Sequence, residues 1–115
     1  MATPVTVQVP SLTAAAPTVT TADATGNNFA PIGSGPHYLR ITNGSGGSIT
    51  CTIDDVNSVG PDGATSFNAD VVVTVPAGTT RLVKMGSLGR FTSGTTGLVA
   101  LAWSAATSVT FELFA

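Results

Sequence analysis

Short runs of strictly alternating apolar and polar residues constrain the fold of this chain more than any other feature. Alternation of this kind sends successive side chains to opposite faces of a β-strand. No window keeps the period of about 3.6 residues that an amphipathic helix needs, and abundant Gly, Pro, Thr and Val also disfavour helices. The alternation indicates strands near residues 5–9, 37–42, 48–54, 71–75, 79–85, 98–104 and 109–114.

These strands predict an all-β fold, namely a single β-sandwich or small jelly roll of about seven to eight antiparallel strands. The length of 115 residues matches one ordinary domain with one core. We expect residues 1–17 to form an extended N-terminal arm or the first strand, and residues 18–115 to form the β-sandwich domain. Residues 18–21 either add a short strand or lie extended over a partner, and residues 26–28 are expected to turn.

The central part of the chain predicts a β-hairpin. Residues 37–42 and 48–54 alternate on either side of a Gly-rich turn at residues 43–47. Paired strands would place apolar side chains from both runs on one core face; these are Leu39, Ile41, Ile49, Cys51 and Ile53. Cys51, the single cysteine, is expected to pack there as a small hydrophobic residue.

Charge is scarce, and its scarcity bears on the partners of the chain. Only 9% of residues are Asp, Glu, Lys or Arg, and the net charge is −2 with four basic residues in no cluster. Nucleic acid binding draws its affinity from many basic contacts, so we expect no nucleic acid partner. The longest apolar run is the six residues 98–103, far short of the roughly 20 that span a bilayer, so we expect no membrane partner.

The start of the chain has no basic region followed by an apolar one, which predicts no secretory signal. A single cysteine fits folding in a reducing cytoplasm. A nearly neutral β-surface favours a subunit that is docked in an assembly, because charges normally keep exposed sheets apart.

No grouping of residues has the pattern of a catalytic, metal or cofactor site. His37 is the only histidine and Glu112 the only glutamate, so a catalytic triad or a pair of catalytic glutamates is unsupported. We interpret His37 as a surface or interface residue at the start of a strand. Four acids, Asp54, Asp55, Asp62 and Asp70, lack the spacing of a calcium loop and are interpreted as solvated loop acids. The sequence therefore predicts no enzyme activity, no metal and no cofactor.

Three segments in order, ATGNNFAPIGSGPHYLRITNGSGGSITCTI, VVVTVPAGTTRLVKMG and FTSGTTGLVALAWSAATSVTFELF, resemble small structural proteins of tailed bacteriophage heads. The resemblance covers roughly residues 24–114 and is carried by the order of the segments more than by any one of them. It implies a capsid decoration or minor capsid protein that has no catalytic residues and binds the outside of the shell. The implied partner is the major capsid protein, with self-association that a trimer would suit. The implied location is the surface of the virion, after synthesis in the host cytoplasm.

Contact residues are expected in three regions. Val5, Val7 and Val9 either add an edge strand to a neighbour or belong to the first strand of the domain itself. Arg90 and Phe91 pair residue types that are enriched at interface hot spots, although Phe91 could equally plug its own core. The loop at residues 55–70 is a candidate because of its length.

Two other functional classes are compatible with the sequence. One is another virion component with the same kind of domain, such as a head fibre, neck or tail protein. The other is an adhesin or carbohydrate-binding domain, which would need exposed aromatic rings. Trp103 alternates with apolar residues and is expected in the core.

Overall fold

The computed structural model describes residues 2–9, 17–33, 35–57, 70–86 and 88–115. Within these ranges every regular element is a β-strand, which confirms the predicted all-β class. The described residues form nine strands: β1 (Thr3–Val5), β2 (Thr20–Thr21), β3 (Asn27–Phe29), β4 (His37–Asn43), β5 (Ile49–Ile53), β6 (Val71–Val75), β7 (Thr80–Gly86), β8 (Val99–Trp103) and β9 (Val109–Phe114).

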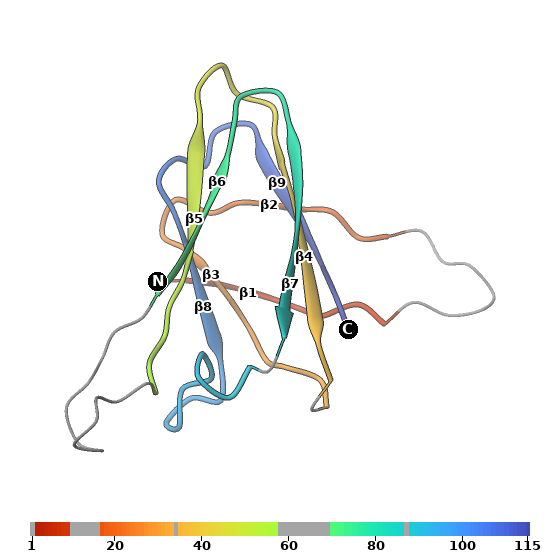
Figure 1. Cartoon of the computed structure of the whole chain (residues 1–115), viewed down its shortest axis with the longest axis vertical. Helices are drawn as coiled ribbons and strands as arrows, with labels where there is room; N and C mark the ends of the chain where they lie inside the picture. The colour runs from red at the N-terminus through yellow and green to blue at the C-terminus, as the bar shows by residue number, and fades with distance from the viewer. Residues whose placement is uncertain (1, 10–16, 34, 58–69, 87) are drawn as a thin grey trace.

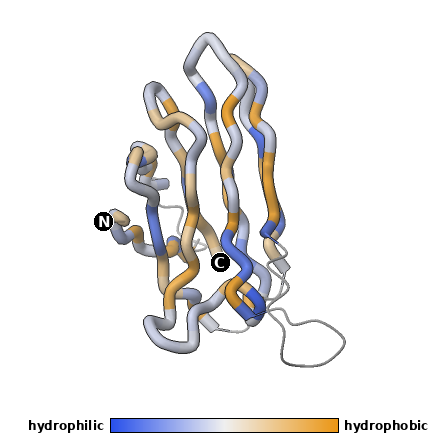
Figure 2. The backbone as a smooth tube through the Cα atoms, turned by 90° about the vertical axis from the view of Figure 1, so that its left-hand side faces the viewer, coloured by the Kyte–Doolittle hydropathy of each residue, from blue (hydrophilic) through white to orange (hydrophobic). Residues whose placement is uncertain are grey.

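The strands form two sheets (Figure 1). A five-stranded sheet has the order β1-β3-β8-β5-β6, and a four-stranded sheet has the order β2-β9-β4-β7. Consecutive strands mostly belong to different sheets, so the chain passes repeatedly from one layer to the other. Figure 2 shows apolar and polar positions alternating along the strands, as expected when one face of each sheet is covered.

The strand pairs are nested in the sequence, so that each pair is enclosed between the two members of the next pair. β5 pairs with β6, β4 with β7, β3 with β8 and β2 with β9, each antiparallel. This describes one long hairpin whose two arms are folded across both sheets. β1 lies outside the nest and pairs with β3 in parallel, so the predicted antiparallel arrangement does not hold for β1, and the described residues contain nine strands where about seven to eight were expected.

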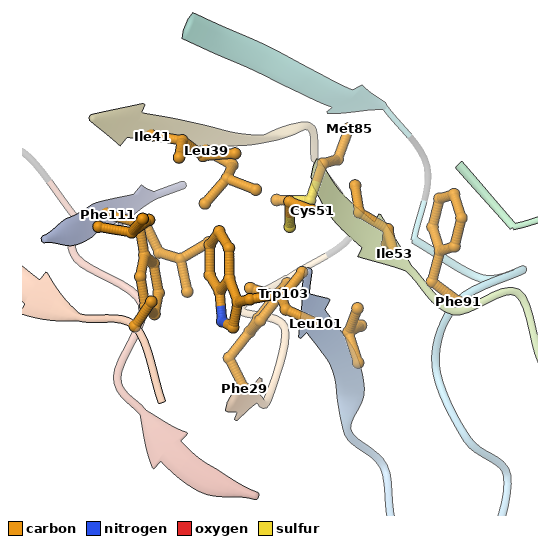
Figure 3. Packing of buried hydrophobic residues seen from close by; sticks show 14 of the residues in the cluster. Phe29, Leu39, Ile41, Cys51, Ile53, Met85, Phe91, Leu101, Trp103 and Phe111 are labelled. Atoms are coloured by element: carbon orange, nitrogen blue, oxygen red, sulfur yellow. The ribbon is translucent and has the colours of Figure 1, made fainter. Parts of the chain in front are cut away.

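One hydrophobic cluster fills the space between the two sheets (Figure 3). β4 and β9 contribute Leu39, Ile41 and Phe111 from one side, and β5 and β8 contribute residues from the other. Trp103 lies in this cluster with its ring centroid 5.1 Å from that of Phe111, and Cys51 is buried beside it, so both core predictions are confirmed.

The predicted hairpin at residues 37–54 was wrong, because β4 and β5 lie in opposite sheets. The connection crosses between layers and is held by the buried Asn43, whose Nδ2 donates to the carbonyl oxygens of Gly47 at 2.8 Å and Val75 at 2.9 Å. Gly44 donates its N–H to the carbonyl oxygen of Ser108, and a Cβ at this glycine would lie 3.1 Å from that oxygen. The side chains of β4 and β5 therefore meet across the core and not along one sheet.

The expected turn at residues 26–28 also needs correction, because Asn27 and Asn28 belong to β3. Asn27 is buried, and its Oδ1 accepts hydrogen bonds from Trp103 Nε1 at 2.8 Å and from the Asp23 N–H at 3.0 Å. The Nδ2 of the same amide donates to the carbonyl oxygen of Thr3 at 3.3 Å, so Asn27 has a structural role that its sequence context, which suggests a turn, does not indicate. The residues predicted to form a short strand at 18–21 do so in part, as β2.

Candidate functional site

The connections at one end of the molecule are short turns, whereas the opposite end carries the longer loops (Figure 1). The described part of this loop end includes residues 30–33, 35–36, 54–57 and 88–98. Two of the regions that sequence identified as contact candidates, the Arg90–Phe91 pair and the loop beginning at Asp55, meet here.

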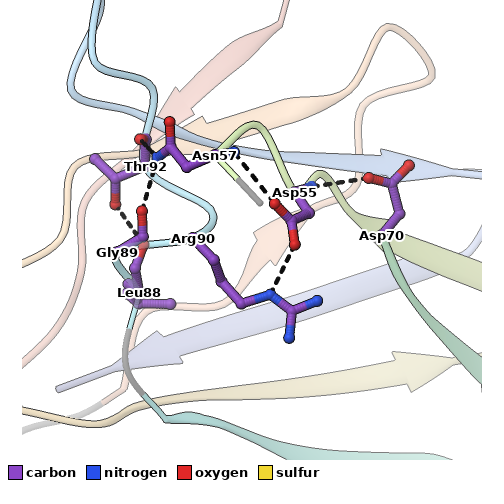
Figure 4. Close-up of polar contacts among 7 residues, drawn as sticks. All are labelled: Asp55, Asn57, Asp70, Leu88, Gly89, Arg90 and Thr92. Carbon is purple, nitrogen blue, oxygen red and sulfur yellow. Dashed lines mark hydrogen bonds and ion pairs between the residues drawn. The ribbon is translucent and has the colours of Figure 1, made fainter. Parts of the chain in front are cut away.

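Arg90 and Asp55 form an ion pair in which the Arg90 Nε lies 2.8 Å from Asp55 Oδ2 (Figure 4). The Asp55 side chain is 0% exposed, whereas the Arg90 side chain is 43% exposed. Asp55 was interpreted as a solvated loop acid, and this was wrong. The arginine also covers the ring of Phe91, with 4.6 Å from its Cζ to the ring centroid.

Asn57 ties the same two loops together through the backbone. Its Nδ2 donates to the carbonyl oxygens of Gly89 at 2.7 Å and Thr92 at 2.5 Å, and its own N–H donates to the carbonyl oxygen of Arg90 at 3.1 Å. Sequence analysis missed this residue, since an asparagine in a polar loop gives no signal of its partners.

Phe91 is buried in the hydrophobic cluster. Of its two expected roles, the structure shows the plug over the protein's own core. Arg90 is therefore the only member of the pair whose side chain reaches the surface in part.

Two acidic residues flank this network. The Asp55 N–H donates to Asp70 Oδ1 at 2.8 Å. Burial, followed by the neighbouring carboxylates of Asp70 and Asp55, raises the pKa of Asp54 above its ordinary value. Within the described ranges, no group of three or more His, Cys, Asp or Glu residues could hold a metal ion.

The N-terminal segment, residues 3–8, crosses from one sheet to the other. β1 pairs with β3 at the edge of the five-stranded sheet, and Gln8 then exchanges backbone hydrogen bonds with Leu113 and Ala115 beside β9, each 2.9 Å long. The prediction of one continuous strand at residues 5–9 was wrong, because the chain changes partner sheet after Val5 and its alternation is interrupted.

The three candidate valines of this segment have different surroundings. Val5 is partly buried against the core and Val7 belongs to it, whereas the Val9 residue is 63% exposed. Residues 3–8 therefore pair with the protein's own sheets, and only Val9 presents a large apolar surface to solvent. The other candidate loop residues, 58–69, lie outside the described residues.

His37 is buried, so its interpretation as a surface residue was wrong. Its Nε2 accepts the N–H of Ile32 at 2.9 Å, and its Nδ1 lies 3.1 Å from the carbonyl oxygen of Gly35, to which the neutral ring donates. The imidazole therefore fixes the loop before β4. Glu112 is similarly occupied, since one of its carboxylate oxygens accepts a 2.8 Å hydrogen bond from Arg40 Nη1.

Comparison with known proteins finds no match among family models, curated sequences or solved structures. Over the described ranges, no helix is long and apolar enough to cross a membrane.

Proposed function

We propose that this chain is a non-enzymatic structural subunit of a tailed-phage particle, which binds the outer surface of the capsid and stabilises the shell. The observation that carries the proposal is the nested pairing of β2 with β9, β3 with β8, β4 with β7 and β5 with β6. This is the order obtained when a long hairpin of eight strands wraps into a jelly-roll sandwich, an architecture that recurs in viral capsid domains.

The outer face of the five-stranded sheet supports a contact role. The positions that point away from the core on β5, β6 and β8 alternate with buried ones and carry small or uncharged side chains, which are Thr50, Thr52, Val72, Thr74, Ala100 and Ala102. Interfaces are depleted of charged residues at their centre. Several copies on a symmetric shell add avidity, so each contact can be weak.

The same architecture occurs in lectins and other binding domains. A carbohydrate site of the stacking type needs an exposed aromatic face, whereas Trp103 is buried and its Nε1 is bonded to Asn27. The resemblance to phage head proteins and the uncharged sheet face both favour the virion. We propose the major capsid protein as partner, with a trimer of this chain as the assembled form.

Copy number tests this function. Purified particles are analysed by quantitative mass spectrometry against the major capsid protein, before and after a chaotrope wash. Copies in simple proportion to the shell subunit, and lost on washing, are expected for a protein added to the outside. A few copies for each particle would indicate a neck, tail or fibre component, and absence from particles would refute the virion proposal.

A matched pair of variants tests the proposed face. Ala102→Lys places a charge in the middle of the uncharged sheet face, whereas Ala105→Lys places the same charge on an exposed turn. We expect Ala102→Lys to lower capsid occupancy and Ala105→Lys to leave it unchanged. Equal occupancy of the two variants would remove this face from the contact.

A further inference from the structure

The two open sides of the paired sheets are not alike. On the side of β1 and β2, residues 3–8 cross from one sheet to the other and Val7 is buried between them. On the opposite side, β6 ends the five-stranded sheet and β7 ends the four-stranded one. Among the described residues no segment pairs with the outer edge of either strand.

A groove lies between these two edge strands. It has a volume of about 340 Å³, and its lining consists of five apolar and two basic side chains: Ile53, Val71, Val83, Met85, Phe91, Lys84 and Arg90. Outside it, Val72 on β6 is 59% exposed and Leu82 on β7 is 70% exposed. This side of the molecule therefore combines an apolar groove, exposed apolar side chains and two sheet edges.

β7 has the length to accept another strand. It is seven residues long, and β4 occupies one of its sides over most of that length. An edge strand presents a row of backbone N–H and C=O groups to solvent, which an extended segment can pair with. The edges on the other side, β1 and β2, have only three and two residues.

The charge at this edge is basic. Three of the four basic residues of the chain lie on β7 or in the groove, namely Arg81, Lys84 and Arg90. Among the described residues, neither Arg81 nor Lys84 is in a salt bridge. Arg81 pairs with Ile41 and Lys84 pairs with Tyr38, so Arg81 lies on the core side of the sheet and Lys84 on its outer face. A carboxylate on the outer face of an added strand would therefore gain a favourable interaction with Lys84 that is sensitive to salt.

A second copy of this chain does not fit the same edge. If two β7 edges paired around a two-fold axis, Lys84 of one copy would lie on the same outer face as Lys84 of the other, and like charges on adjacent strands are destabilising. Lys84 therefore acts against self-pairing while it favours an acidic occupant.

We propose that the β6/β7 edge binds an extended segment of another protein, which adds a strand to β7, inserts apolar side chains into the groove and places carboxylates on the outer face beside Lys84. The proposal goes beyond the capsid function, because it concerns the isolated protein and the chemistry of its partner. It assigns a binding role to a surface that the sequence patterns did not identify.

Two labelled peptides of seven residues, the length of β7, test it by fluorescence anisotropy with the purified full chain. One alternates valine with glutamate and the other alternates valine with lysine. We expect the glutamate peptide to bind at least roughly tenfold more tightly, which corresponds to about 1.4 kcal/mol. Added salt should weaken this binding.

Variants matched in net charge locate the site. The variant Lys84→Gln should weaken binding of the glutamate peptide by about two- to fivefold. Ala105→Glu lowers the net charge equally at an exposed position away from the groove, and its affinity should remain that of the unmodified chain. Amide hydrogen exchange adds a structural test, since strand addition should protect amides of β7 when the peptide is bound.

Equal binding of the two peptides, binding of neither, or full binding by the Lys84→Gln variant would each overturn the proposal. A dimer detected by sedimentation that competes with the peptide would assign the edge to a second copy instead. These outcomes do not depend on capsid copy number, so failure here and failure of the capsid proposal are distinguishable.

Discussion

Replacing Arg90 by glutamine removes the cation that neutralises a fully buried carboxylate. The wild-type pair joins the segment that follows β5 to the loop that follows β7, with 2.8 Å between Arg90 Nε and Asp55 Oδ2. The variant leaves the Asp55 carboxylate at a position where its side chain is 0% exposed. The cost should therefore exceed that of removing an ordinary surface charge.

The magnitude is worked from two contacts of the Arg90 side chain, the ion pair with Asp55 and the contact with the Phe91 ring. A hydrogen bond to a charged group contributes about 1.5–3 kcal/mol, and the contact with the Phe91 ring adds about 0.5–1 kcal/mol. We therefore expect Arg90→Gln to lower the free energy of unfolding by about 2–4 kcal/mol. For a domain of this size about 4 °C is lost per kcal/mol, so the Tm should fall by roughly 8–16 °C.

Replacing the other member of the ion pair, Asp55→Asn, should lower the free energy of unfolding by less, about 1–2 kcal/mol. Asparagine can still accept the Asn57 N–H, which Asp55 Oδ1 accepts at 3.2 Å, and the half-exposed Arg90 can regain water. Because each single change leaves a partner behind, the double variant should be less destabilised than the sum, with a coupling energy of at least about 1 kcal/mol.

Urea unfolding of the wild type, the two single variants and the double variant measures this coupling energy. Arg81→Gln serves as the matched control. Arg81 is exposed on β7, so its loss should change stability by less than about 0.5 kcal/mol. If Arg90→Gln were no more destabilising than Arg81→Gln, or if the two changes at the ion pair were additive, the buried pair would not hold the loops together.

Two further predictions concern titratable groups. Hydrogen bonds from the Thr3 hydroxyl and from Thr25 lower the pKa of Asp23 from 3.8 to about 2, so this stabilisation is present above the ordinary pKa and lost as the pH falls toward 2. The Tm of the wild type should therefore fall more steeply over that interval than the Tm of Asp23→Asn, and equal slopes would contradict the argument. Burial raises the pKa of the Cys51 thiol to about 12, so a thiol reagent should label it only as fast as the protein unfolds, whereas rapid labelling of the native protein would show that the site opens locally.

Alternation located most strands correctly because it depends only on which side chains face the core. It placed residues 71–75 and 109–114 at the bounds observed for β6 and β9. It could not assign strands to sheets, since Ile41 and Ile49 face the same core whether they belong to one sheet or to opposite ones. The hairpin error arose from this ambiguity, which the hydrogen bonds of Asn43 resolve.

The candidate contact residues were harder to predict. Val7 and Phe91 are apolar residues beside polar ones, and the sequence cannot tell whether such a residue packs inside the protein or contacts a partner.

The β6/β7 groove did leave a signal in the sequence. Leu82 is followed by Val83, and β6 begins with three successive valines, so both strands carry apolar residues on both faces. This pattern is unexpected for a strand with one solvated face.

The nested pairing has a consequence for the order in which the chain can fold. β5 and β6 are the closest of the nested partners in sequence, whereas β2 must wait for β9, and Gln8 must wait for Leu113 and Ala115. Contacts between such distant residues slow folding because a long loop must close first. During synthesis, β2 and Gln8 therefore remain without these partners until residues 109–115 leave the ribosome. Loss of residues 113–115 should accordingly free the backbone of Gln8 from the four-stranded sheet.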